Sequence, residues 1–176
     1  MGAPGLGRWT GIPRERFVIF VTVGTDQPFD RLVRAVDDWA ERSGRRDVFA
    51  QVGRSQWKPR HLDYCQFMAP ADFRRRFIQA RIVVAHAGMG TILTALQYQK
   101  PLVIMPRLAS LGEQRNEHQL ATARYLSSTR GVAVAADEAE LSRLLAGLDD
   151  IAALEPIGAS AQPSLIEAVE SFIYAR

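Results

Sequence analysis

Residues 82–106 restrict the possible folds of this chain more than any other stretch. They read IVVAHAGMGTILTALQYQKPLVIMP. The apolar run at 82–85 is typical of a parallel strand that is buried on both faces. A turn of small residues and a short helical pattern follow, and Lys100-Pro101 ends that helix because proline cannot continue it. Since a second apolar run comes at once at 102–105, the stretch predicts a βαβ unit with a right-handed crossover.

The glycine turn of this unit has the features of a diphosphate site. Gly88 and Gly90 allow the main chain to approach a ligand closely. The helix expected from Thr91 directs free N–H groups and a partial positive charge at the same point, where a diphosphate is the natural occupant. Many βα turns carry two glycines for packing alone, so the turn by itself leaves both interpretations open.

The rest of the chain continues the alternation of strands and helices. Further strand patterns lie at 17–23, 47–52, 64–68 and 132–135, and further helical patterns at 29–41, 70–78, 117–126 and from 137 onward. The 29–41 helix carries Arg31, Arg34, Asp37 and Asp38 mostly on its polar face. The prediction is an α/β fold in which helices flank a mostly parallel sheet. Ligands bind such sheets beyond the carboxyl ends of the strands, an edge expected to hold the polar loops 24–26, 86–91 and 107–119.

The length of 176 residues favours one domain. Residues 1–16 are rich in glycine, proline and arginine without periodicity, which predicts a flexible N-terminal arm ahead of a single domain at 17–176. Apolar residues recur at helical spacing at 164–174. This last helix either packs on the sheet or docks a partner, and the pattern leaves both open.

Composition excludes several classes of protein. A formal net charge of +3 suits an acidic ligand or an anionic membrane surface but is too small to indicate a nucleic-acid-binding protein. The single cysteine, Cys65, excludes an internal disulfide, and no apolar run approaches the roughly 20 residues that span a bilayer. Neither a signal peptide nor a metal-ligand pattern is apparent, so a cytoplasmic protein without metal or cofactor is expected. The run Arg74-Arg75-Arg76 predicts a solvated helix face or a patch for lipid head groups or an acidic partner.

Four motifs occur in order along the chain: VTVGT at 21–25, HAGMGT at 86–91, KPLVIMP at 100–106 and NEHQLA at 116–121. Together they resemble the C-terminal, donor-binding domain of glycosyltransferase family 28, and the likeness covers about residues 17–150. A closer likeness is to stand-alone donor subunits that pair with a membrane-anchored partner, as in bacterial exopolysaccharide synthesis. The resemblance implies a Rossmann-like domain that forms one lobe of a GT-B glycosyltransferase.

The resemblance assigns a role to each motif. The glycine turn would bind the diphosphate of a UDP-sugar, with His86 beside it, and the loop at 24–25 would face the reacting end of the donor. In the loop after 106, Glu113, Asn116, His118 and Gln119 would line the sugar pocket or order the loop. The donor-binding residues that the resemblance implies are Gly24, Thr25, His86, Gly88, Met89, Gly90, Thr91, Thr94, Arg107, Glu113, Arg115, Asn116, His118 and Gln119.

Three residues are candidates for catalysis: His86, Asp26 and His118. Each also has a structural alternative. His86 could flank the helix and bond to the main chain, and His118 could orient its loop. Asp26 could act as a base or cap the helix that follows, since aspartate is a strong cap residue.

Thr94 departs from the family pattern. Many members carry a glutamate at this position, where it holds the ribose hydroxyls, whereas a threonine can make one such hydrogen bond. Recognition of the ribose is therefore expected to be weaker here or to involve another side chain.

The favoured hypothesis is a catalytic donor-binding subunit of a two-component inverting glycosyltransferase. It would move a sugar from a UDP-sugar to a polyprenyl-diphosphate-linked acceptor in exopolysaccharide synthesis, at the inner face of the plasma membrane and with a membrane-anchored partner subunit. Glucuronate is the expected sugar, because Arg107 and Arg115 could bind its carboxylate. The alternatives are a UDP-N-acetylglucosamine transferase subunit and a non-catalytic nucleotide-sugar-binding module. A dinucleotide-binding oxidoreductase fits poorly, because neither glycine turn reads G-x-G-x-x-G.

Overall fold

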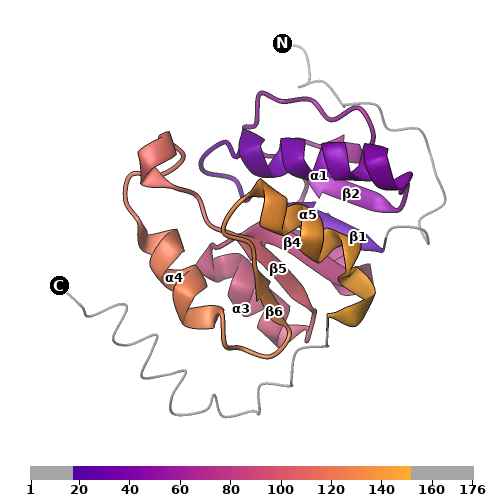
Figure 1. The fold of residues 1–176 in the computed structure, drawn as a ribbon. Helices are drawn as coiled ribbons and strands as arrows, with labels where there is room; N and C mark the ends of the chain where they lie inside the picture. Colours follow the sequence, from indigo (N-terminus) through magenta and orange to yellow (C-terminus); the bar gives the residue numbers. More distant parts are fainter. Residues whose placement is uncertain (1–17, 152–176) are drawn as a thin grey trace.

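Six parallel strands form one sheet at the centre of the computed structural model, which describes residues 18–151 (Figure 1). Across the sheet the strands lie in the order β3-β2-β1-β4-β5-β6, and every neighbouring pair is parallel. Their bounds are β1 (Ile19–Thr22), β2 (Val48–Gln51), β3 (Asp63–Cys65), β4 (Ile82–His86), β5 (Leu102–Met105) and β6 (Val132–Val134). The parallel α/β sheet that the alternating pattern predicted is confirmed.

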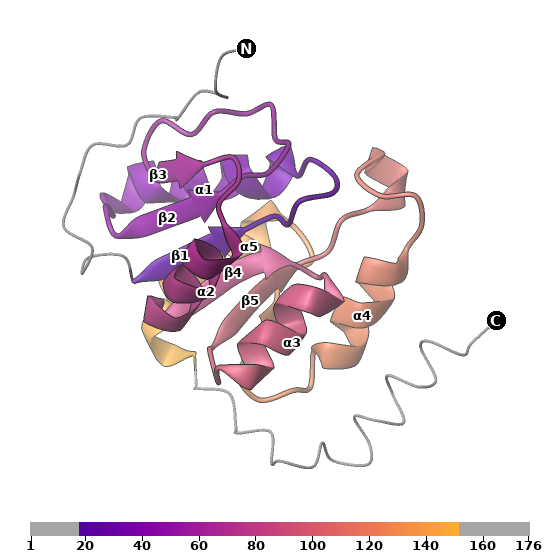
Figure 2. The ribbon, with the colours of Figure 1, turned by 180° about the vertical axis from the view of Figure 1, so that it is seen from behind.

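Helices cover both faces of this sheet (Figures 1 and 2). On one face lie α1 (Asp30–Ser43) and α5 (Glu138–Ala146), which contact each other. On the other lie α2 (Pro70–Gln79), α3 (Met89–Gln97) and α4 (His118–Leu126). Two short 3₁₀ turns, η1 (Ala109–Leu111) and η2 (Leu148–Asp150), follow β5 and α5.

Alternate residues of the central strands contribute to two separate apolar cores. Val21 and Val84 belong to the core under α1 and α5, while Phe20 and Val83 belong to the core under α2, α3 and α4. Because side chains alternate between the faces of a strand, a strand covered on both sides needs apolar residues at every position. This requirement explains the unbroken apolar run of β4, in which residues 82–85 are all buried.

The predicted βαβ unit is present as β4, α3 and β5, and its two strands pair directly, with Val84 beside Val103. Helix α3 begins at Met89, two residues before the expected start, and Gly88 is its N-cap. Later in the chain, Asp137 is the N-cap of α5, and its side chain accepts a hydrogen bond from the Glu140 N–H at 2.7 Å.

Asp37 corrects the predicted polar face of α1. Its side chain is buried, and its carboxylate accepts hydrogen bonds from the N–H groups of Arg60 and His61 at 2.8 to 3.1 Å. Two turns earlier, Asp30 accepts from the N–H of Gln56 at 2.9 Å. Two carboxylates of α1 thus hold the long connection between β2 and β3, a role that helical periodicity does not reveal.

The arginine run on α2 is divided between solvent and the sheet. Arg74 and Arg75 are exposed, and Arg75 pairs with Asp72 at 2.5 Å. Arg76 instead lies over the ring of Phe49, 3.8 Å from its centroid.

Two predicted segments, the N-terminal arm at 1–16 and the helix at 164–174, lie outside the described residues. Within residues 18–151, no helix combines the length and apolarity needed to cross a membrane.

Candidate functional site

The strand order places a crevice between the carboxyl ends of β1 and β4. From β1 the chain continues to β2 on one side, and from β4 it continues to β5 on the other, so the loops after these two strands diverge. A cleft of about 280 Å³ lies there. It is lined by Val23, Gly24, Thr25 and Asp26 after β1, Phe73 of α2, His86, Gly90, Thr91 and Thr94 after β4, and Arg107 after β5.

The first turn of α3 offers hydrogen-bond donors at this cleft. The N–H groups of Thr91 and Ile92 both bond to the Gly88 carbonyl at 3.1 Å. Those of Met89 and Gly90 bond to no acceptor within residues 18–151. A Cβ atom built on Gly90 would meet nothing within 4 Å, so this glycine borders the open space of the cleft. Two unused donors and the positive end of the helix dipole suit an anion.

The ring of His86 fills the space between two glycines. A Cβ atom on Gly88 would overlap its Nε2 atom, and one on Gly24 would lie 2.9 Å from its Cε1 atom. Gly24 also has a φ of +76°, which few other residues adopt. These two glycines therefore make room for a histidine ring, whereas Gly90 leaves room at the cleft.

His86 is neutral at physiological pH. The pKa of its ring is lowered to about 4, first by burial and then by the positive charge of Arg107, against a smaller opposite effect of the Thr22 main chain. Its buried Nδ1 atom has no partner in hydrogen-bonding geometry within the described residues. The ring can therefore donate or accept a hydrogen bond at the cleft but does not carry a positive charge of its own.

Arg107 is buried and holds the loop between β1 and α1. Its guanidinium donates to the carbonyls of Val23 at 2.7 Å, Gln27 at 2.6 Å and Pro28 at 3.4 Å, and it lies over the Phe29 ring, 5.0 Å from the centroid. Burial lowers the pKa of this side chain to about 10, while the charges of Glu113 and Asp26 act in the opposite direction. It remains charged at neutral pH, and no carboxylate of residues 18–151 lies within ion-pair distance of it.

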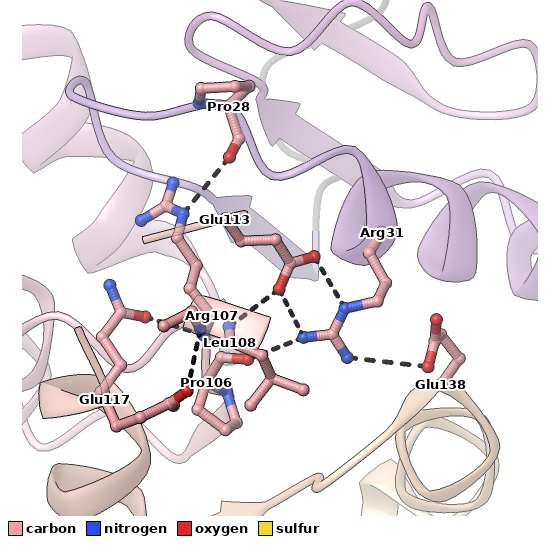
Figure 3. Close-up of polar contacts among 10 residues, drawn as sticks. Pro28, Arg31, Pro106, Arg107, Leu108, Glu113, Glu117 and Glu138 are labelled. Carbon is pink, nitrogen blue, oxygen red and sulfur yellow. Dashed lines mark hydrogen bonds and ion pairs between the residues drawn. The ribbon is translucent and has the colours of Figure 1, made fainter. Parts of the chain in front are cut away.

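Glu113 orders the loop between β5 and α4 instead of lining the cleft (Figure 3). Both of its carboxylate oxygens accept from Arg31 at 2.8 Å, and one also accepts from the Leu108 N–H at 3.0 Å. Arg31 further donates to the Pro106 carbonyl at 2.9 Å. Burial would lower the pKa of Arg31, but the hydrogen bonds and charges of Glu113 and Glu138 together outweigh it and raise that pKa.

The start of α4 completes this loop. The Asn116 side chain accepts from the His118 N–H at 3.3 Å, Glu117 accepts from Ala109 at 3.1 Å, and the buried Gln119 accepts from the Arg107 N–H at 3.1 Å. Residues 115–119 are not among those that line the cleft, and the side chains of Arg115 and His118 are exposed. The loop between β5 and α4 and the loop between β1 and α1 lie at the same edge of the sheet (Figure 2).

The cap expected of Asp26 is not formed. Helix α1 has Phe29 as its N-cap, without a side-chain cap hydrogen bond, so Asp26 precedes the helix by too many residues to serve it. Its exposed side chain instead borders the cleft.

Sequence reasoning did not find Arg31 and Phe73. Phe73 lines the cleft from α2 and packs against the Phe20 ring at 5.4 Å between centroids, and Arg31 binds the carboxylate of Glu113. Cys65 offers no nucleophile, because burial raises the pKa of its thiol to about 11. Within residues 18–151 no group of three or more potential metal ligands occurs.

Residues 18–165 match the sequence model of the family described as glycosyltransferase family 28 C-terminal domain. No curated protein sequence matches the chain. Solved structures with a similar fold include the NMR structure of ALG13 (20% identity, TM-score 0.61) and the crystal structures of the glycotransferase of kitacinnamycin (16%, 0.58) and of CalG4, the calicheamicin glycosyltransferase (15%, 0.55).

The matches differ in how much of each protein they cover. The similarity to ALG13 covers 91% of this chain and 98% of ALG13. The similarity to the glycotransferase of kitacinnamycin covers 96% of this chain and 43% of that protein, and the similarity to CalG4 covers 94% of this chain and 45% of CalG4. The chain thus spans less than half the length of those two glycosyltransferases, and it has the fold of one lobe of the GT-B architecture.

Proposed function

This chain belongs to the glycosyltransferase family 28 C-terminal domain family, and from that premise we propose that it is the donor-binding, catalytic subunit of a two-component inverting glycosyltransferase. One observation carries the proposal. The cleft at the switch point of the sheet combines two unused N–H groups of α3 with the glycine at position 90, a combination suited to the diphosphate of a nucleotide-sugar.

The donor lies with its diphosphate on the first turn of α3. The N–H groups of Met89 and Gly90 donate to it, and Thr91 adds a hydroxyl group at the same turn. The Thr94 hydroxyl already donates to the Gly90 carbonyl at 2.7 Å, so toward a ribose it acts as an acceptor. A ribose hydroxyl would therefore donate to Thr94, which gives one hydrogen bond.

Transfer inverts the sugar in one displacement. The acceptor hydroxyl attacks the anomeric carbon, the bond from that carbon to the diphosphate oxygen breaks, and UDP leaves with the bonding electrons. The α3 N–H groups stabilise the charge that develops on UDP. Neutral His86 donates or accepts a hydrogen bond beside it, and the Asp26 carboxylate, exposed at the cleft, takes the proton of the acceptor hydroxyl. His118 lies outside the cleft lining and serves the loop before α4.

The acceptor side comes from another polypeptide segment. The chain spans 43% and 45% of two similar glycosyltransferases, which supports a missing lobe. We assign that lobe to a membrane-anchored partner subunit that binds a polyprenyl-diphosphate-linked saccharide in exopolysaccharide synthesis. The chain then works at the inner face of the plasma membrane.

Glucuronate is the proposed donor sugar. The charge of Arg107 lies at the cleft without a carboxylate at ion-pair distance within residues 18–151, and exposed Arg115 belongs to the same loop. Because the Arg107 guanidinium already donates to three carbonyls, Arg115 is the better candidate for direct contact with a sugar carboxylate. An N-acetylglucosamine donor is the alternative.

Ligand-induced shifts of the melting temperature test the donor site. UDP should raise the melting temperature of the purified chain more than UMP at equal concentration, and NAD should not raise it. Equal shifts from UDP and UMP would contradict a diphosphate site.

Transfer of radiolabelled sugar to lipid extract tests the catalytic role. The chain with a membrane fraction that holds its partner should label lipid from UDP-glucuronate, and the chain alone should not. UDP binding without transfer under either condition would favour a non-catalytic nucleotide-sugar-binding module. Preferential transfer from UDP-N-acetylglucosamine would replace the sugar assignment and leave the donor-subunit assignment intact.

A further inference from the structure

Two arginines connect the two loops that border the cleft, each reaching across to the other loop. Arg107 begins the loop after β5 and binds the carbonyls of the loop after β1. Arg31, in the first turn of α1, binds the loop after β5 in return. The Phe29 ring lies near both guanidinium groups, at 5.0 Å from Arg107 and 5.3 Å from Arg31.

Arg31 joins three separate points of the loop after β5. It donates to the Pro106 carbonyl and to both oxygens of Glu113, and Glu113 in turn accepts from the Leu108 N–H (Figure 3). Side chains in this pair are 12% and 13% exposed, so solvent screens the interaction little. A second contact of Arg31, to Glu138 at 3.6 Å, ties the same guanidinium to α5.

The diphosphate side of the cleft has no such connection to Arg31. The turn before α3 is held by bonds among its own residues, from Gly88 to His86 and from Thr91 and Ile92 to Gly88. A change at position 31 therefore reaches the loop after β5 without altering the α3 donors.

We propose that Arg31 is a positioning residue: through Glu113 it sets where the 107–117 loop stands beside the cleft, so that recognition of the donor sugar depends on it and diphosphate binding does not. This inference rests on the proposed function. It makes the bidentate geometry of arginine essential, because a lysine would keep the charge but could not bind both carboxylate oxygens in the same way.

The test compares the dissociation constants of UDP, UDP-glucuronate and UDP-N-acetylglucosamine for the full chain and its variants. In Arg31→Gln the dissociation constant of UDP should stay within about twofold of the wild-type value. The dissociation constant of the preferred UDP-sugar should rise about tenfold more than that of UDP. Arg31→Lys should recover little of that loss. Glu113→Gln and the double variant should resemble Arg31→Gln, since two residues that act as a unit are not additive. Arg42→Gln, on the same helix, is the matched control and should bind like the wild type.

Two outcomes would overturn the inference: equal losses for UDP and UDP-sugars that track a fall in melting temperature, or unchanged ratios for both sugars in Arg31→Gln. Failure of the wild-type chain to bind UDP would instead refute the proposed function. In that case amide exchange still decides the positioning role. In Arg31→Gln, amide exchange should be faster than in the wild type at residues 107–117 and unchanged at residues 86–92. An equal change of the exchange rate in both segments would contradict the positioning role.

Discussion

The two sides of the cleft reach their geometry by different means. The turn before α3 is built from consecutive residues, and its main-chain bonds run between positions at most four apart. The loop after β5 depends on a carboxylate whose partner, Arg31, lies 82 residues earlier in the chain. One side follows from local sequence, and the other exists only once α1 and β5 have come together.

This difference separates two kinds of robustness. Distant substitutions leave the α3 turn in place, because its bonds are local. The loop after β5 can be moved by a single change on α1. A fold of this type can therefore keep the geometry of its α3 turn while the neighbouring loop changes, and the following experiments test each side separately.

The largest expected effect is at Gly90. Gly90→Val places a branched side chain at the cleft, where a Cβ atom has open space around it, so the variant should fold with an unchanged melting temperature. Binding of UDP, measured by calorimetry, should weaken by about 100-fold or more, or about 3 kcal/mol. Gly90→Ala should show a smaller loss in the same direction. Normal UDP binding by Gly90→Val would place the diphosphate elsewhere.

Acid should destabilise the fold through His86, whose pKa is lowered first by burial and then by the positive charge of Arg107. The unfolded chain binds a proton at this ring below about pH 6.5 and the folded chain only below about pH 4, so the free energy of unfolding falls as pH drops across that window. The loss should approach about 3 kcal/mol. Urea denaturation from pH 7 to pH 4 measures it, and His86→Asn should remove this part of the slope. Equal slopes for both proteins would show that the ring titrates normally.

A selective effect is expected at Arg115 if the donor is UDP-glucuronate. Arg115→Ala should weaken UDP-glucuronate about tenfold and UDP-glucose little, since only the first offers a carboxylate to the guanidinium. Arg124→Ala, an exposed arginine of α4, is the matched control. Equal weakening of both sugars in Arg115→Ala would contradict a glucuronate contact.

The smallest expected effect is at Thr94. Thr94→Val removes one hydroxyl that a ribose can bond to and should weaken UDP by about threefold to fivefold, close to 1 kcal/mol. Binding of inorganic diphosphate should not change. Thr94→Glu should strengthen UDP, because a carboxylate can accept from two ribose hydroxyls. Equal changes for UDP and diphosphate in Thr94→Val would exclude a ribose contact.

Local patterns were sufficient to predict most of the fold. The apolar run of β4, the proline after Lys100 and the alternation of elements predicted the βαβ unit and the parallel sheet, and the pattern from 137 onward predicted α5. These features depend on neighbours in sequence and on burial at both faces of a strand, and both are visible in the residues themselves.

Side chains that act across the fold could not be predicted in the same way. Periodicity placed Asp37 toward solvent, yet the connection after β2 covers it and supplies N–H donors. Arg31 looked like any charge on a helix face, because Glu113 meets it only in the folded chain. Asp26 resembled a cap, but the chain runs on to Phe29 before α1 begins.

The packing of His86 also limits the order in which this site can evolve. Gly88→Ala alone would force a methyl group into the ring, whereas after His86→Gly the same methyl group would no longer meet that ring. The two substitutions are thus expected to show sign epistasis: Gly88→Ala is harmful while His86 is present and tolerated once His86 has been replaced. Lineages of this domain should therefore lose the histidine before the glycine, and positions 86 and 88 should covary among relatives.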